Sequence, residues 1–156
     1  MKLLMDADCL IKLTKAGLKE LVANKISITI PAVVQKEVVH SGKEKGCADA
    51  TVVEDNIDAG MIAIAESGSE YGSGDDALIA LFQKEIYDAV ATDDAKLTRQ
   101  LRIKSIPFIL PGVVIYKLFR DNLINRKSAL RALRQLAEFI SEDEFSTVRL
   151  LMETGK

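Results

Sequence analysis

The sequence predicts an α/β fold, a three-layer α/β/α arrangement around a mostly parallel central sheet, with extra helices at the C-terminus. Two observations support this prediction. Short apolar runs alternate with longer segments of helical periodicity, as in a parallel sheet whose strands are connected by helices. The last part of the chain contains only helical patterns, so those helices are expected to pack on the sheet as an additional layer.

The expected strands follow one another at intervals along the chain. Residues 2–5 form a first apolar run, and residues 26–30 alternate β-branched side chains. Residues 61–65, 89–91 and 106–110 are three further short runs of this kind. Because helical patterns separate most of these runs, neighbouring strands are expected to run parallel.

Helical patterns fill the intervals between the strands. Gly17 and Gly60 end two of them, and Pro31 opens another, since proline favours the first position of a helix. Ser141 and Glu144 have the spacing of a capping box at the start of the last helix. The predicted helices cover residues 9–16, 18–24, 32–40, 47–59, 75–85, 94–101, 112–123, 128–139 and 142–153.

A length of 156 residues is sufficient for one domain with its own apolar core. We therefore expect a single domain over residues 1–156, with a C-terminal helical extension from about residue 112 packed on it. No apolar run approaches the roughly 20 residues of a membrane helix, and Asp6 comes too early for a signal peptide. The expected location is the cytoplasm, with no membrane partner.

Histidine and cysteine are too rare for several classes of site. His40 is the only histidine, so a catalytic triad would have to use it. Cys9 and Cys47 have neither zinc-ligand spacing nor a CxxC motif, and they are interpreted as small buried side chains. Chemistry based on thiolates or clustered imidazoles is therefore not expected.

Charge is distributed unevenly, although the net charge is only −2. Residues 1–95 contain 9 lysines, no arginine and 17 acids, a balance of −8. Residues 96–156 contain 12 basic residues, including all 7 arginines, and 6 acids, a balance of +6. This asymmetry within one small domain indicates a metal site beside an anion-binding surface.

Acidic residues occur where predicted strands end and where predicted helices begin. Ligands of parallel α/β sheets bind at the carboxyl ends of the strands, so these side chains are expected to meet at one edge. Aspartate at a helix start also caps the helix, which alone would explain any single helix-start aspartate. The acids in these positions, with one glutamate in the helix after Pro31, are Asp6, Asp8, Glu37, Asp75, Asp76, Asp93 and Asp94.

A converging set of carboxylates needs positively charged partners. Asp6 directly follows an apolar strand, where hydration is poor, and neighbouring carboxylates repel one another. Because the chain has one histidine and no thiolate cluster, the partner is expected to be a hard, oxygen-preferring cation, Mg²⁺ or Mn²⁺, as one or two ions.

Four motifs, in their order and spacing, resemble those of PIN-domain nucleases, and the resemblance covers the whole chain. LLMDADCLIKL resembles the opening strand with its first catalytic aspartate, which is Asp6 here. Asp8 stands where the family often has Ser, Thr or Asn. IPAVVQKEV resembles the second motif and places its glutamate at Glu37.

The third and fourth motifs lie later in the chain. YGSGDDALIAL resembles a Gly-x-Gly segment followed by an acid, with the register open between Asp75 and Asp76. AVATDDAKLTRQL resembles the fourth motif, Thr-x-Asp, which favours Asp94 over its neighbour Asp93. The tail from PGVVIYKLFRDN onward resembles the helical C-terminus of one prokaryotic subgroup of the family.

The resemblance implies a metal-dependent endoribonuclease that hydrolyses RNA phosphodiester bonds. Many small members resemble the toxins of VapBC toxin–antitoxin pairs, so an antitoxin protein and a homodimer are further implied partners. The implied catalytic residues are Asp6, Glu37, Asp76 and Asp94. The implied metal ligands are Asp6, Glu37, Asp75, Asp76, Asp93 and Asp94, with Asp8 and Thr92 beside them.

Basic residues close in sequence to the acidic motifs are candidate phosphate contacts, although each has the alternative of being an ordinary surface charge. These candidates are Lys12, Lys36, Arg99 and Arg102.

Three other functions remain open at this point. A PIN fold without catalysis would act as a binding module. A haloacid-dehalogenase-type phosphatase also begins with a strand and Asp-x-Asp, but Cys9 stands where Thr or Val is expected after the second aspartate. A receiver-like signalling module would need an aspartate at the end of a middle strand, where this chain has Ala65 and Glu66.

Overall fold

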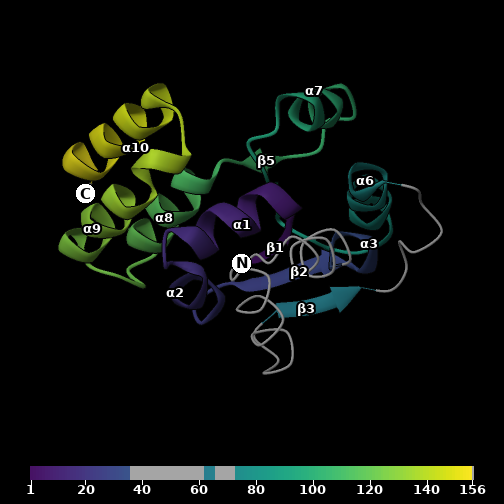
Figure 1. Ribbon diagram of the computed structural model, residues 1–156, viewed down its shortest axis with the longest axis horizontal. Coiled ribbons are helices and arrows are strands. Elements are labelled where there is room, and N and C mark those ends of the chain that lie inside the picture. Colours follow the sequence, from purple (N-terminus) through teal and green to yellow (C-terminus); the bar gives the residue numbers. More distant parts are fainter. Residues whose placement is uncertain (36–61, 66–72, 156) are drawn as a thin grey trace.

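The computed structural model describes residues 1–35, 62–65 and 73–155. In this part of the chain one sheet has the strand order β3-β2-β1-β4-β5, and every pairing is parallel (Figure 1). The predicted α/β class with a parallel central sheet is thereby confirmed. The strands are β1 (Lys2–Met5), β2 (Ser27–Pro31), β3 (Ile62–Ala65), β4 (Ala89–Ala91) and β5 (Phe108–Ile109).

The helices of the described residues lie close to their predicted positions. Gly17 ends the first helical segment with φ +72°, a conformation that glycine adopts without steric cost. The helices are α1 (Ala7–Lys15), α2 (Lys19–Ala23), α3 (Ala32–Gln35), α6 (Gly74–Lys84), α7 (Ala95–Ile103), α8 (Pro111–Arg120), α9 (Arg126–Leu136) and α10 (Glu142–Thr154), with a 3₁₀ turn at Ala137–Phe139.

The main differences from the prediction concern element ends. Pro31 is the last residue of β2, and the helix expected to begin with it starts at Ala32. The final strand is shorter than expected, because only Phe108 and Ile109 pair with β4. The predicted helix 47–59, with Cys47 and His40, lies outside the described residues.

Side chains of each strand alternate between two apolar clusters on opposite faces of the sheet. Leu3 and Met5 belong to the cluster formed with α1, α2 and the C-terminal helices, whereas Leu4 belongs to the cluster formed with α6 and α7. Val90 and its neighbours divide in the same way. Because both faces are covered, the strands are apolar almost throughout, as buried parallel strands require.

The C-terminal helices α8, α9 and α10 pack together beside α1 and α2, at the opposite end of the molecule from α7 (Figure 1). Ser141 caps α10 by accepting a hydrogen bond from the backbone N–H of Glu144, as its spacing suggested (3.1 Å). The Glu144 carboxylate accepts from the Gly112 N–H at the start of α8 instead (2.7 Å). This bond links α10 to α8, whereas in a capping box the Glu144 side chain would have bonded to the backbone N–H of Ser141 in its own helix.

None of the helices in the described ranges has the length and apolar character that crossing a bilayer requires.

Candidate active site

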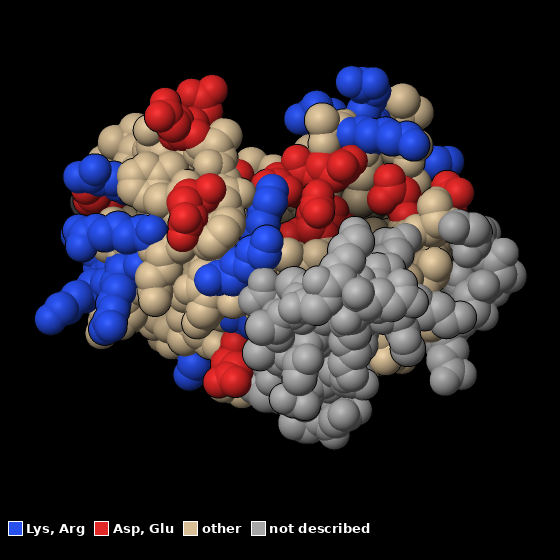
Figure 2. Space-filling view, in the orientation of Figure 1, with Lys and Arg blue, Asp and Glu red and all other residues tan. Residues whose placement is uncertain are grey.

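A pocket of about 180 Å³ lies where α3 meets the N-terminal ends of α1, α6 and α7. Four of its lining side chains are carboxylates, contributed by three separate segments of the chain. Figure 2 shows acidic side chains gathered in the hollow at the centre of this face, with basic side chains on α7 beside them. The lining residues are Asp6, Ala7, Asp8, Val34, Gly74, Asp75, Leu78 and Asp94.

Asp6 and Asp94 each cap the helix that follows them. Oδ1 of Asp6 accepts from the N–H of Cys9 (2.8 Å), and Oδ1 of Asp94 accepts from the N–H of Leu97 (2.7 Å). A carboxylate has two oxygens and about four acceptor positions, so capping leaves each side chain able to bind another group. Capping and a functional role are therefore compatible at both positions.

Thr92 connects these two acids. Its hydroxyl donates to Oδ2 of Asp6 and accepts from the backbone N–H of Asp94 at 3.1 Å. Thr92 is fully buried, so these are the natural partners of its hydroxyl. The Thr-x-Asp spacing thus places the Thr92 hydroxyl where it orients both the Asp6 carboxylate and the turn that carries Asp94.

Replacement of Thr92 by valine, which has nearly the same shape but no hydroxyl, is expected to lower stability by about 1–3 kcal/mol. The buried carboxylate of Asp6 and the N–H of Asp94 would both lose a partner. If the site acts as proposed below, cleavage is expected to fall roughly 10–100-fold. Thr92→Ser keeps the hydroxyl and is the control; equal effects of the two substitutions in denaturation and kinetics would contradict this role.

The electrostatic environment of the pocket disfavours carboxylate charge. Burial raises the pKa of Asp6 to about 7, assisted by Asp8 and Asp93 and opposed by the hydrogen bonds from Thr92 and Cys9. Burial also raises the pKa of Asp75, and the neighbouring charge of Asp94 adds to the effect. Burial and the neighbouring carboxylates thus both make the charged form of these acids unfavourable, which a bound cation would reverse.

Within the pair Asp75 and Asp76, only Asp75 lines the acidic pocket. Successive residues of a helix point about 100° apart, so the two side chains cannot face the same way. Asp76 is exposed and lines a separate groove between α6 and α7. The geometry therefore favours Asp75 as the partner of Asp6 and Asp94.

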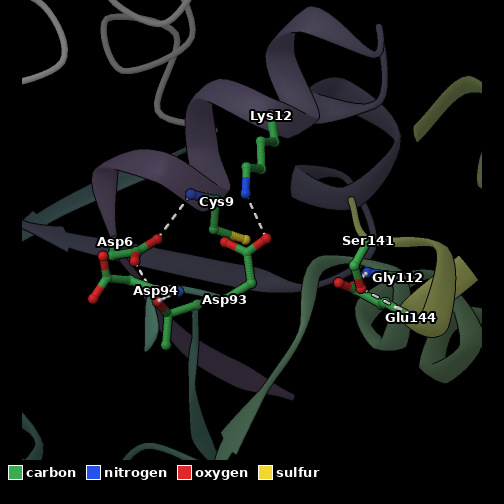
Figure 3. A network of polar contacts seen from close by, with 9 residues as sticks. Asp6, Cys9, Lys12, Asp93, Asp94, Gly112, Ser141 and Glu144 are labelled. Carbon is green, nitrogen blue, oxygen red and sulfur yellow. Dashed lines mark hydrogen bonds and ion pairs between the residues drawn. The ribbon is translucent and has the colours of Figure 1, made fainter. Parts of the chain in front are cut away.

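Within the pair Asp93 and Asp94, the two carboxylates have different partners. Asp94 lines the pocket, whereas Oδ2 of Asp93 forms an ion pair with Nζ of Lys12 (2.5 Å). Figure 3 shows Lys12 reaching from α1 to Asp93, while Asp6 and Asp94 lie side by side next to this pair. Lys12, expected as a phosphate contact, thus directs its ammonium group to Asp93.

The remaining predicted residues fall into two groups. Glu37 and Lys36 lie outside the described residues. Arg99 and Arg102 are exposed on α7, the helix that Asp94 caps, and the guanidinium of Arg102 lies over the ring of Phe108 (5.3 Å to the centroid). Neither arginine lines the acidic pocket, so both remain candidate phosphate contacts on the surface of α7.

The donor set fits a hard divalent cation in kind. The pocket offers carboxylate oxygens from Asp6, Asp75 and Asp94, which Mg²⁺ and Mn²⁺ prefer, and burial together with neighbouring carboxylates raises the pKa of Asp6 and Asp75. Among residues 1–35, 62–65 and 73–155, no three His, Cys, Asp or Glu side chains are close enough together to hold a metal ion as they stand. The carboxylates of Asp6, Asp75 and Asp94 therefore line one pocket, but in the described residues they are not close enough together to coordinate one ion.

Two interactions near the pocket were not foreseen from the sequence. Lys12 and Asp93 are 81 positions apart, and Glu144 binds Gly112 across 32 positions. Lys12 had been considered only for its proximity to Asp6, and Glu144 only for capping. The one available signal was their residue type, since a lysine or glutamate on the buried side of a helix needs a partner.

One of three comparisons with known proteins found a match. The family model described as "DUF3368: PIN domain" matches residues 2–154 of the chain. No curated protein and no solved structure matches it.

Proposed function

The chain belongs to the PIN-domain family, a nuclease-type fold, and from this premise we propose that it is a metal-dependent endoribonuclease. The observation that carries the proposal is the pocket at the start of α1, α6 and α7, which is lined by Asp6, Asp75 and Asp94. The carboxylates come from three chain segments, and together with the family they favour hydrolysis of phosphodiester bonds.

In this proposal Asp6, Asp75 and Asp94 hold one or two Mg²⁺ or Mn²⁺ ions, with Glu37 as a further ligand. A bound ion would supply a water of lowered pKa and neutralise charge on the phosphate. Thr92 holds Asp6 through its hydroxyl, and the N-terminal turns of α1 and α7 fix the capping oxygens of Asp6 and Asp94. No side-chain nucleophile is required, which agrees with a chain that contains one histidine.

The direct test is cleavage of single-stranded RNA by the purified protein with Mn²⁺ or Mg²⁺. Cleavage is expected to require the ion and to stop when EDTA is added. Asp94→Asn, purified in parallel, is the control, because it keeps the cap of α7 but removes a charged ligand. Equal cleavage by Asp94→Asn would assign the activity to a contaminant and contradict the proposal.

Asp75 and Asp76 provide a second, internal test. Asp75→Asn is expected to lower kcat/KM by roughly 10²-fold or more, a loss of about 3 kcal/mol of transition-state stabilisation. Asp76→Asn removes the same charge one residue away, outside the pocket, and is expected to change kcat/KM by less than about threefold. Both variants are measured on the same labelled RNA. A larger loss of kcat/KM in Asp76→Asn than in Asp75→Asn would indicate that Asp76 is the metal ligand.

Arg99 and Arg102 are proposed to bind the RNA backbone. They lie three residues apart on α7, the helix that the pocket residue Asp94 caps, and both are exposed. If each neutralises one phosphate, replacing both by glutamine is expected to reduce the slope of log affinity against log salt by about 1.4. Arg131 and Arg134, two exposed arginines on the distant helix α9, are the matched control pair (Figure 1). An unchanged slope in the α7 variant would contradict the contact.

A binding module without catalysis is the second candidate, and the absence of a finished three-ligand cluster in the described residues favours it. It predicts RNA binding without metal-dependent cleavage.

Further proposals follow from the resemblance to VapC-type proteins. They are a toxin role, inhibition by an antitoxin that enters the acidic pocket, a homodimer and a cytoplasmic location. Coexpression with the product of a neighbouring gene tests for the antitoxin. The mass of the purified protein in solution tests for the homodimer.

A further inference from the structure

We infer that the Lys12–Asp93 ion pair positions the active site, by fastening α1 to the β4–α7 turn so that Asp6 and Asp94 face one pocket. This inference rests on the proposed nuclease function and deepens it. It assigns to Lys12 and Asp93 a role different from RNA contact and metal ligation.

The pair joins the two segments that present the pocket acids. Lys12 belongs to α1, the helix that Asp6 caps, and Asp93 immediately precedes Asp94, the cap of α7. The Nζ–Oδ2 distance is 2.5 Å, and the two side chains are only 27% and 14% exposed. Together with the Thr92–Asp6 hydrogen bond, the pair makes a second connection between α1 and the residues that follow β4 (Figure 3).

The surroundings of the pair indicate an internal role. Asp93 does not line the acidic pocket, and its second oxygen, Oδ1, is buried with no hydrogen-bond partner in the described part of the protein. Burial opposes the charge of Lys12, but the hydrogen bond and charge of Asp93 outweigh it and raise the lysine pKa. The ammonium group is therefore held as the counter-ion of a poorly hydrated carboxylate.

The charge of Lys12 also acts on a second buried acid, Glu144, to a smaller extent. Burial raises the pKa of Glu144, the charge of Asp93 adds to this, and the charge of Lys12 opposes it. Glu144 comes from α10 and binds the N-terminus of α8, so the C-terminal helices meet the pocket region at this junction. Loss of the lysine charge would leave Asp93 without its ion-pair partner and would add to the repulsion between Asp93 and Glu144.

A positioning role predicts a defined kinetic pattern. Lys12→Met keeps much of the side-chain length but removes the charge, and it is expected to lower kcat roughly 10–100-fold, as loss of a partner behind a metal ligand does. The KM for RNA is expected to change less than about threefold, because Lys12 would not contact RNA. Asp93→Asn is expected to produce a similar loss, and the double variant no more than the larger single loss.

Mn²⁺ binding, followed by calorimetry, provides a measurement that does not depend on cleavage. Both single variants are expected to bind Mn²⁺ about tenfold more weakly, and Lys12→Arg is expected to rescue both binding and kcat because it restores the charge. Lys15→Met, which removes an exposed cation from the same helix, is the control and should match the unaltered protein within about twofold.

The outcomes distinguish this inference from the proposed function. If the unaltered protein neither binds Mn²⁺ nor cuts RNA, the proposed function fails and the positioning role falls with it. If it does both and Lys12→Met raises KM alone, Lys12 is an RNA contact. If Asp93→Asn abolishes Mn²⁺ binding while Lys12→Met preserves it, Asp93 is a ligand. Either of the last two results overturns the positioning role alone, and thermal denaturation separates all of them from misfolding.

Discussion

Replacing Asp6 by asparagine is expected to abolish RNA cleavage and, at the same time, to stabilise the metal-free protein. The activity should fall roughly 10²–10⁴-fold, because a charged ligand of the proposed metal site is lost. This fall corresponds to a loss of about 3–5 kcal/mol of transition-state stabilisation. The stability should rise because the Asp6 carboxylate is 6% exposed, and burial raises its pKa to about 7.

The stabilising effect has a clear physical origin. Above pH 7 the charge of Asp6 costs the folded state roughly 4 kcal/mol, since its pKa moves from 3.8 to about 7 and each pH unit is worth about 1.4 kcal/mol. Asparagine caps a helix as well as aspartate does and can still accept from the Cys9 N–H. Its amide must rearrange against Thr92, so a net gain of about 2 kcal/mol, or about 4–8 °C in Tm, is expected.

Thermal denaturation in EDTA at pH 8 measures this effect. Asp76→Asn is the matched control, because it removes an exposed carboxylate and should change stability by less than about 0.5 kcal/mol. An Asp6→Asn variant that is inactive but no more stable than the unaltered protein would mean that Asp6 is already compensated in the metal-free fold. Retained cleavage would remove Asp6 from the proposed site.

The stability of the metal-free protein is expected to fall as the pH rises from about 4 to about 7. In the unfolded chain Asp6 loses its proton near pH 3.8, whereas the folded protein retains it up to about pH 7. Within this window the folded state binds one more proton, so the free energy of unfolding decreases with pH and the Asp6 contribution becomes constant above it. Burial raises the pKa of Asp75 and of Glu144 in the same direction.

Urea denaturation at several pH values, with EDTA, isolates the Asp6 contribution by comparison with Asp6→Asn. Near pH 4, where the Asp6 charge costs the folded state little, the variant should be about 2 kcal/mol less stable than the unaltered protein. At pH 8 it should be about 2 kcal/mol more stable, so the difference between the two proteins should change by about 4 kcal/mol across the window. Parallel profiles for the two proteins would contradict the raised pKa. At pH 8, Mn²⁺ at 100 times its Kd should stabilise the unaltered protein by about 2.7 kcal/mol and the variant much less.

Much of the architecture was predictable because it depends on local pattern. The apolar runs at β1 and β4 and the helical periodicity of α6 to α10 are recorded in short windows of sequence, and the structure places them within a few residues of expectation. The acids at strand ends were predictable for the same reason, since parallel strands carry their carboxyl ends to one edge. Pro31 was misassigned because proline is compatible with both a strand end and a helix start.

Adjacent acids show where this kind of prediction stops. Asp75 and Asp76 have the same chemistry and nearly the same position, and only the rotation of α6 against the sheet directs one to the pocket and the other to a groove. Asp94 caps α7 and lines the pocket, whereas Asp93 pairs with Lys12. No spacing rule contains that information, because it depends on how α1 packs beside the β4–α7 turn.

By itself, the sequence determined that this protein is an α/β protein with carboxylates at the ends of its strands and helices, because secondary structure and strand polarity follow from local pattern. The tertiary structure alone decided which carboxylates share a pocket and which is neutralised by a lysine 81 residues away. Charge interactions act through space over a few ångströms, so they depend on packing between segments that the order of residues does not specify.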